Sequence, residues 1–205
     1  MNNIRCTSAA AIAIAAFAGT ASASMTPGQP ITLTQESAVS VQFVSQSAGA
    51  RGSLYFLGAE SGGVMTSAAS SDANNLGMFL FENHGASPSD ITQLGEFAAG
   101  TTLQFAYLIT NGVFVAPTGS LFRTDDPVST FNFAVGDASF INGSSVTRVG
   151  IEDIQNPAYS DFDYNDIVFD VRMTAVPAPG SIALAMAGGA MFIRRRKSEP
   201  NGRAL

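Results

Sequence analysis

The sequence contains no tryptophan, one cysteine and one histidine, so several kinds of chemistry have few or no residues to perform them. Cys6 lies near the N-terminus, and the rest of the chain therefore has no disulfide, no thiolate nucleophile and no cysteine-based metal site. His84 has no serine or cysteine nucleophile motif around it, which favours a turn residue over a general base. The absence of tryptophan also removes a common platform for stacking sugars. We therefore expect a protein that is not an enzyme.

Basic residues are scarce as well, and they are unevenly distributed. Residues 24–175 contain four arginines and no lysine against fifteen aspartates and glutamates, a net charge of −11, whereas the whole chain has −6. A surface this acidic repels phosphate backbones, so we expect no nucleic-acid partner. The same surface attracts cations.

The first 23 residues have the organisation of a secretory signal peptide. Arg5 supplies the positive charge, residues 9–18 form a short apolar run, and Ala21 and Ala23 form a cleavage site of the A-x-A type. The alternative, an N-terminal membrane helix, is disfavoured because this run is too short for a hydrocarbon core of about 30 Å. We expect signal peptidase to remove residues 1–23 during export.

The segment 176–197 has three parts in a characteristic order. A proline motif comes first, an apolar stretch over 181–193 follows, and a basic run over 194–197 ends the segment. The motif and the arginines of the basic run are Val176, Pro177, Ala178, Pro179 and Gly180, and Arg194, Arg195 and Arg196. As a helix the apolar stretch would span about 20 Å, and the basic run would hold its end on the cytoplasmic side. Residues 198–205 are predicted to form a disordered end.

This order of parts resembles the PEP-CTERM sorting tail of bacteria that use an exosortase. Ala178 stands where the name-giving motif has glutamate, which makes the motif the Val-Pro-Ala-Pro-Gly variant. The resemblance implies an exosortase-type processing enzyme that cuts near the motif and releases or re-anchors the domain. A plain C-terminal membrane anchor without processing is the alternative.

The central residues, 24–175, carry the pattern of β-strands. The predicted strands cover residues 39–44, 53–57, 77–81, 103–109, 113–115, 130–135, 146–151 and 165–171. Asn111-Gly112 predicts a tight hairpin with positive φ at both positions, and residues 59–75 are predicted as a flexible loop. About eight strands favour an all-β fold with a single jelly-roll-like β-sandwich, flanked by the signal peptide and the short C-terminal apolar helix.

Oxygen-bearing side chains gather late in this domain, at Glu152, Asp153, Asp161, Asp163, Asn165 and Asp166. Asp161, Asp163 and Asn165 occupy alternate positions, and such residues point to the same side in an extended chain. Calcium takes about six to eight oxygen ligands from carboxylates, amides and carbonyls. An EF-hand is excluded, because position 6 is Asp166 instead of glycine and position 12 is Arg172 instead of glutamate. We predict a Ca²⁺ site in a sandwich loop.

The alternative is a solvated acidic turn in which Asp and Asn side chains cap backbone groups. Two observations disfavour it. The carboxylates would repel one another, and the domain has no lysine to relieve them. Phe162 and Tyr164 also interleave with the acids, so that one face can pack while the other faces an ion.

The sequence from Val149 to Asp153, followed by Asp-Phe-Asp-Tyr-Asn-Asp-Ile-Val-Phe over 161–169, is similar to the signature of a family of secreted bacterial domains of unknown function. Segments 76–85 and 105–112 resemble earlier strands of that family, which extends the resemblance over about residues 75–174. The resemblance implies an extracellular β-domain with suspected calcium binding and no known reaction. By this resemblance, the same six residues are the expected calcium ligands.

The expected function is therefore that of an exported structural or interaction protein, at the cell surface or outside the cell, with a domain stabilised by Ca²⁺. Its expected partners are the two processing enzymes, the membrane through the C-terminal helix, and exopolysaccharide or other matrix components. A carbohydrate-binding module is the alternative, and a hydrolase that uses the acidic loop is a weaker one.

Overall fold

The computed structural model of the chain describes residues 25–177, except 115, 155 and 157. The predicted signal peptide and the tail from Ala178 onward lie outside the described residues. In the described part the chain is all-β, and its one helical element is the short 3-10 helix η1 (Thr130–Asn132). No helix in this part is long and apolar enough to cross a membrane.

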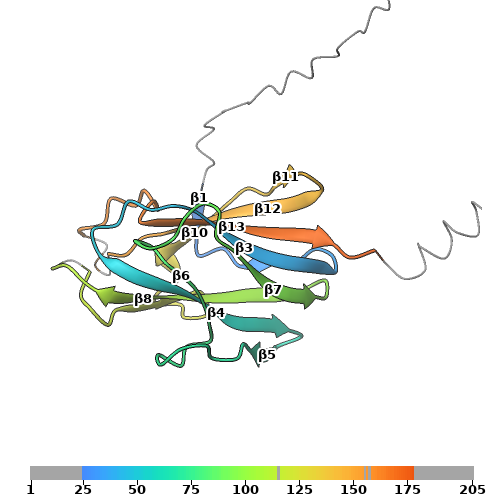
Figure 1. Cartoon of the computed structure of the whole chain (residues 1–205), viewed down its shortest axis with the longest axis horizontal. Helices are drawn as coiled ribbons and strands as arrows, with labels where there is room; N and C mark the ends of the chain where they lie inside the picture. Colours follow the sequence, from blue (N-terminus) through green and yellow to red (C-terminus); the bar gives the residue numbers. More distant parts are fainter. Residues whose placement is uncertain (1–24, 115, 155, 157, 178–205) are drawn as a thin grey trace, which may run out of the picture.

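The strands form two antiparallel sheets that face each other (Figure 1). The seven-stranded sheet has the order β1-β10-β12-β13-β3-β7, with β11 paired to β12, and the six-stranded sheet has the order β2-β8-β4-β5, with β6 paired to β4 and β9 to β8. The first sheet contains β1 (Met25–Pro27), β3 (Ser37–Ser45), β7 (Ile91–Phe97), β10 (Phe133–Gly136), β11 (Ser139–Ile141), β12 (Ser144–Ile151) and β13 (Ile167–Ala175). The second contains β2 (Ile31–Thr32), β4 (Arg51–Ser61), β5 (Val64–Ser67), β6 (Met78–Glu82), β8 (Thr102–Asn111) and β9 (Leu121–Arg123).

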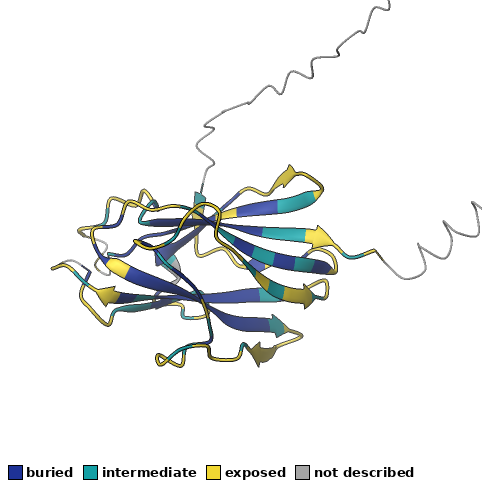
Figure 2. Cartoon of the chain, in the orientation of Figure 1, coloured by how far each residue is buried: buried dark blue, intermediate teal, exposed yellow. Residues whose placement is uncertain are grey.

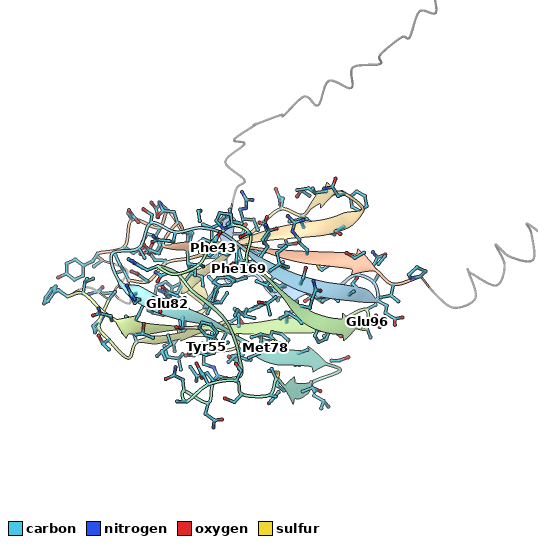
Figure 3. All side chains as sticks on the ribbon, viewed as in Figure 1. Phe43, Tyr55, Met78, Glu82, Glu96 and Phe169 are labelled. Carbon is cyan, nitrogen blue, oxygen red and sulfur yellow. The ribbon has the colours of Figure 1, made fainter. Side chains whose placement is uncertain are left out.

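The core lies between the sheets, where their inward faces are buried (Figure 2). β3 alternates buried and part-exposed residues, as its sequence predicts, and Phe43 is one of the buried ones. Phe169 of β13, labelled in Figure 3, contacts rings of the opposite sheet. Its ring centroid lies 6.3 Å from that of Phe81 and 5.4 Å from that of Phe105. Each side chain of this size contributes about 1.5–3 kcal/mol when fully buried, so aromatic contacts of this kind join the two sheets.

The predicted hairpin at Asn111-Gly112 is wrong in its turn. Neither residue has a positive φ, and β8 and β9 are joined by the longer segment 112–120. Predicted strand 113–115 is reduced to an isolated bridge between Val113 and Ala116. A Cβ on Gly112 would lie 2.2 Å from the Ala116 carbonyl oxygen. This glycine therefore makes room for a loop that folds back on itself.

The predicted loop over 59–75 is wrong in its first half. Residues 59–61 belong to β4, which turns at Gly62 and Gly63 (φ 58° and 80°) and pairs with β5. Strands β1, β2, β7, β9 and β11 are also absent from the prediction. They are short or largely exposed strands, and their sequences have little of the apolar alternation that marks a buried strand.

One end of the sandwich carries the segment 152–166, and we call it the acidic end. β12 ends there with Ile151, and β13 begins there with Ile167, its partner in the sheet. β13 then runs to the opposite end, where Ala175 pairs with Ser37 and is followed by Val176 (Figure 1). The acidic segment and the point where the chain leaves the sandwich therefore lie at opposite ends of β13.

Candidate metal site

The acidic end brings three carboxylates from two neighbouring strands together. Glu152 and Asp153 directly follow β12, and Asp166 directly precedes β13. The pairing of Ile151 with Ile167 places them side by side, and the Asp153 backbone N–H donates to Asp166 Oδ2 at 2.8 Å. One carboxylate oxygen from each of the three lies within 4.8 Å of the others. We call this set the inner group.

A second set, which we call the outer group, contains Glu152 again with Asp161 and Asp163. Their carboxylate oxygens also lie within 4.8 Å of one another. The predicted extended chain is wrong here, because Phe162 and Tyr164 adopt positive φ values of 54° and 51°. Such values are uncommon for any residue other than glycine. Alternate left-handed residues, and not a straight strand, turn these aspartates toward Glu152.

Asn165 contacts the outer group through Asp163. Its backbone N–H donates to Asp163 Oδ1 at 3.2 Å, and its side-chain amide donates to Asp163 Oδ2. The residue therefore orients an aspartate of the outer group. Five of the six predicted ligands are thus carboxylates that converge in two sets, and the sixth contacts one of them.

Burial makes this arrangement costly by itself. Glu152 is 1% exposed and Asp153 is 4% exposed. No hydrogen bond of normal geometry reaches either carboxylate oxygen of Glu152 or Oδ2 of Asp153 within the described residues. Buried charged groups are normally paired, hydrogen-bonded or bound to a metal. These oxygens are therefore available to a ligand from outside the chain.

The pKa values respond to this environment. Burial, and then repulsion from Asp166, raise the pKa of Glu152 to about 7, and the nearby Ser160 hydroxyl acts in the opposite direction without offsetting them. Burial, followed by the charges of Asp166 and Glu152, raises the pKa of Asp153 to about 7. Burial also raises the pKa of Asp166. Glu152 and Asp153 therefore retain protons close to neutral pH unless another cation takes their place.

The arginines of the domain do not supply that cation. Arg51 pairs with Glu82 at 3.1 Å, Arg123 with Asp125 at 2.8 Å and Arg148 with Asp170 at 2.9 Å. Arg172 lies in β13 opposite Ser40, five residues beyond the start of that strand. Among the ion pairs of residues 25–177, none therefore reaches the inner or the outer group.

A short scaffold holds the acidic segment in place. The Glu152 N–H donates to the Asn132 carbonyl at 2.8 Å, and Asn132 Nδ2 donates to the carbonyls of Glu152 and Ile154 at 2.7 and 3.2 Å. The Tyr164 hydroxyl donates to the Phe131 carbonyl at 3.1 Å. Residues of the 3-10 helix η1 thus hold both the start and the end of the segment through hydrogen bonds.

Two residues of the site were missed from the sequence. Tyr107 of β8 has a buried hydroxyl without a hydrogen-bond partner among the described residues, and burial, followed by the charges of Asp153 and Asp166, raises its pKa. Gly150 lies under the acidic segment, where a Cβ would come within 2.3 Å of the Tyr164 carbonyl oxygen. The sequence signal that could have revealed Tyr107 is its place among the inward-facing residues of β8, where a side chain with a hydroxyl group is unusual.

The acids Asp125 and Asp126, by contrast, have hydrogen-bond partners within the chain. Arg123 binds Asp125 through two hydrogen bonds of 2.8 Å. Asp126 accepts hydrogen bonds from the Val128 N–H at 2.9 Å and from the Ser129 hydroxyl at 2.9 Å. His84 likewise contacts the carbonyls of Ala48 and Ala50 through Nε2, at 3.2 and 3.1 Å. Contacts within the chain therefore account for these residues.

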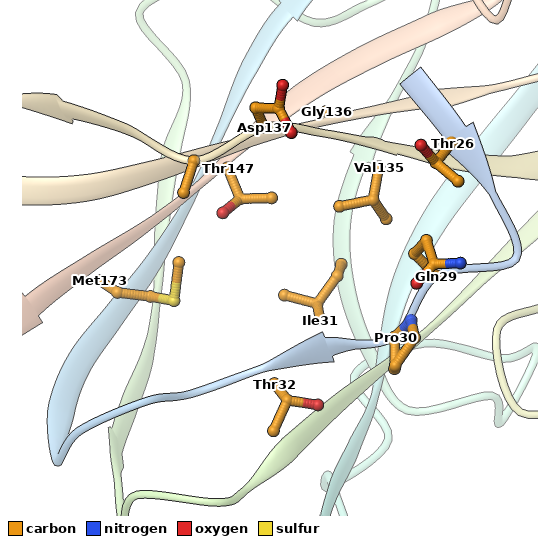
Figure 4. A pocket seen from close by; sticks show the side chains of 11 residues that line it. Thr26, Gln29, Pro30, Ile31, Thr32, Val135, Gly136, Asp137, Thr147 and Met173 are labelled. Carbon is orange, nitrogen blue, oxygen red and sulfur yellow. The ribbon is translucent and has the colours of Figure 1, made fainter. Parts of the chain in front are cut away.

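A concavity elsewhere in the sandwich does not contain the acidic residues. It opens beside β2, between Ile31 and Thr32 on one side and Val135, Thr147 and Met173 on the other (Figure 4). Asp137 is its one acid and no basic side chain lines it. The concentrated charge of the domain therefore lies at the acidic end and not in this pocket.

The chemistry of the two groups suits a hard cation. All their ligand atoms are carboxylate oxygens, which favour calcium, magnesium or manganese over zinc or copper. Oxygens that share one calcium ion at about 2.3–2.6 Å lie at most about 5 Å apart. Both groups meet this condition with their oxygens within 4.8 Å.

Comparison with protein families gives a match of residues 97–174 to the family described as a domain of unknown function (DUF4114). The matched part runs from the end of β7 nearly to the end of β13 and includes all six predicted ligands, whereas residues 76–85 lie outside it. Comparison with curated proteins and with solved structures gives no match. Over residues 97–174 the chain is thus similar to this family, and strands β1–β6, which complete the sandwich, precede the matched part.

Proposed function

We propose that the protein is an exported structural or interaction protein whose β-sandwich binds Ca²⁺ at the acidic end. The observation that carries the proposal is Glu152, which is 1% exposed and whose two carboxylate oxygens have no hydrogen bond of normal geometry among the described residues. Asp153 and Asp166 lie beside it, and none of the ion pairs among the described residues reaches these acids. A divalent ion would neutralise this set and join the end of β12 to the start of β13.

Calcium fits better than the other hard cations for two reasons. It accepts irregular sets of carboxylates and carbonyls, whereas magnesium requires nearly octahedral geometry and gives up its water reluctantly. It also binds extracellular modules with dissociation constants of about 0.1–1 mM, so a site of moderate affinity suffices outside the cell. Binding to the folded domain alone adds to its stability by linkage.

The calcium part of the proposal is tested by thermal unfolding with calcium and with a chelator. When calcium exceeds its dissociation constant about 100-fold, linkage adds about 2.7 kcal/mol, which raises Tm by about 5–10 °C for a domain of this size. Asp153→Asn should remove this rise in Tm. Asp137→Asn makes the same chemical change on an exposed acid outside the cluster and should retain it. An unchanged Tm for the wild-type chain would exclude the calcium proposal.

Export and sorting are the second part of the proposal. The signal-peptide pattern of residues 1–23 supports export, and the resemblance of residues 176–197 to a sorting tail supports processing by an exosortase-type enzyme. The sandwich holds the chain as far as Val176, whose N–H donates to the Glu36 carbonyl at 3.1 Å. Because this point lies at the opposite end of β13, an anchored domain would present the acidic end away from the membrane (Figure 1).

Mass measurement of the protein recovered from its native host tests the sorting proposal. We expect a mature chain that begins at Ser24 and ends within or close to the motif 176–180. A chain that is intact through Leu205 would contradict the cleavage and would favour a plain anchor.

Carbohydrate binding is a second candidate function, because aromatic side chains are exposed on the acidic segment itself. Tyr159 is 63% exposed and Phe162 is 44% exposed. Such rings could stack on sugars of an exopolysaccharide while the site binds calcium. Calcium-dependent retention on a polysaccharide gel that Tyr159→Ala with Phe162→Ala abolishes would favour this function. A hydrolase is not proposed, since a glycosidase needs two carboxylates on opposite sides of a bond.

A further inference from the structure

We propose that the acidic end binds two calcium ions and that Glu152 bridges them. The inner ion is held by Glu152, Asp153 and Asp166, and the outer ion by Glu152, Asp161 and Asp163. This inference rests on the proposed function and goes further, because it assigns the number of ions and gives each one a separate role.

The first argument is geometric. Two oxygens bound to one calcium ion at about 2.3–2.6 Å can lie no more than about 5 Å apart. The five carboxylates meet this condition as two trios, each with its oxygens within 4.8 Å, and the trios share Glu152 alone. Apart from the shared Glu152, the two trios also lie on different parts of the backbone. Asp153 and Asp166 adjoin paired strands, whereas Asp161 and Asp163 lie on the turn with positive φ values.

The second argument concerns Glu152 itself. A single ion that takes one oxygen of this residue leaves the other oxygen buried and unsatisfied, unless it binds the carboxylate in a bidentate manner. Both oxygens are inaccessible, in keeping with the 1% exposure of the residue, and neither has a hydrogen bond of normal geometry in the described part of the chain. A bridging carboxylate gives each oxygen one cation, which removes both unsatisfied groups at once.

The third argument is electrostatic. Five carboxylates lie in the two groups, and the ion pairs among the described residues do not reach them. One divalent ion would leave three negative charges, part of them buried, whereas two ions leave one. Because unpaired buried charge is costly, the second ion has a clear electrostatic reason to bind.

The two ions have different environments and therefore different roles. Asp153 is buried and Asp166 is half-buried, so the inner ion joins β12 to β13 and stabilises the fold. Asp161 and Asp163 are exposed, so water or oxygens of a partner must complete the shell of the outer ion. Its binding orders the turn around Phe162 and contributes little to global stability.

The test counts calcium ions on the full-length chain by native mass spectrometry, while Tm is measured on the same samples with calcium and with a chelator. The wild-type chain should bind two ions. Asp161→Asn combined with Asp163→Asn should bind one ion and retain the calcium-dependent rise in Tm. Asp153→Asn should also bind one ion but lose that rise. Asp137→Asn is the matched control and should bind two.

The outcomes separate this inference from the proposed function. One ion on the wild-type chain, unaffected by the Asp161 and Asp163 substitutions, would overturn the outer site and leave the calcium-stabilised domain in place. Loss of the rise in Tm on substituting Asp161 and Asp163 would contradict the division of roles. A wild-type chain that binds no calcium would overturn both. Circular dichroism of each variant verifies that it has folded.

Discussion

At the scale of single residues, Gly150 shows how the sandwich accommodates the acidic segment. It lies in β12, where its backbone pairs with Val168 of β13. A Cβ at this position would lie 2.3 Å from the Tyr164 carbonyl oxygen and 2.8 Å from its Cβ. The segment after β12 therefore lies directly against the backbone of the strand, and only glycine leaves room for it.

Gly150→Ala should accordingly destabilise the domain by about 1–3 kcal/mol, the usual cost of overpacking, and should weaken calcium binding by displacing Tyr164. Urea unfolding and a calcium titration measure the two effects. Gly49→Ala is the control, because a Cβ on Gly49 meets nothing within 4 Å. Equal stabilities of the two variants would show that the acidic segment can move away from β12 without cost.

The candidate ligands could be predicted from the sequence, but their geometry could not. The prediction of a cation site rests on carboxylates spaced by one residue, near Glu152 and Asp153. The convergence depends on positive φ at Phe162 and Tyr164, which a sequence of aromatic residues does not suggest. Tyr107 comes from another sheet, and only the packing of the sheets places it beside Asp153 and Asp166.

At the scale of elements, β4 differs from an ordinary strand of a sandwich because both of its faces are buried. Leu54 and Phe56 face the main core, whereas Tyr55 and Leu57 face a second, smaller cluster. The segment between β5 and β6, residues 68–77, covers this outer face. The Tyr55 hydroxyl donates to Asp72 Oδ2 at 2.6 Å and accepts from Asn74 Nδ2 at 2.7 Å, which ties the segment to the strand.

Tyr55→Phe should therefore release residues 68–77 while leaving the core of the sandwich intact. Two hydrogen bonds to a buried ring are lost, one of them to a carboxylate, and we expect a cost of about 1–2 kcal/mol. Hydrogen exchange should become faster in 68–77 and remain unchanged in β13. Tyr159→Phe is the control, since Tyr159 is 63% exposed. Unaltered exchange in 68–77 would mean that Leu76 and its neighbours hold the segment without these bonds.

The strands that could be predicted are those with a strong apolar pattern. Residues 39–44, 53–57, 103–109 and 146–151 lie within β3, β4, β8 and β12. The missed strands lie at edges or are very short, as in β7 with its mostly exposed residues. Backbone pairing with a neighbour, and not their own side chains, makes such segments strands. Their existence therefore depends on the fold around them.

At the scale of the whole molecule, the raised pKa values at the acidic end make stability depend on pH. Glu152 and Asp153 have a pKa of about 7 in the folded protein, whereas in an unfolded chain such groups titrate near pH 4. Between these values the folded state binds more protons than the unfolded state. Stability without metal must then decrease as the pH rises through this window.

We expect the chelated protein to be more stable at pH 5 than at pH 8, as measured by urea unfolding. Saturating calcium should abolish or reverse this trend, because the ion competes with protons for the same carboxylates. Asp153→Asn should flatten the pH dependence of the chelated protein. A stability of the chelated wild-type chain that increases from pH 5 to pH 8 would contradict the burial of uncompensated carboxyls at this end.

The sequence by itself determined the all-β character, the excess of negative charge and the identity of the acidic residues, because alternation and side-chain chemistry are local properties. Only the tertiary structure decided which acids share a group, which of them lose contact with water, and which residues support them. The order of strands in the two sheets was likewise decided there. The physical reason is that burial and charge pairing depend on neighbours distant in the chain. Glu152 and Asp166 meet because Ile151 pairs with Ile167.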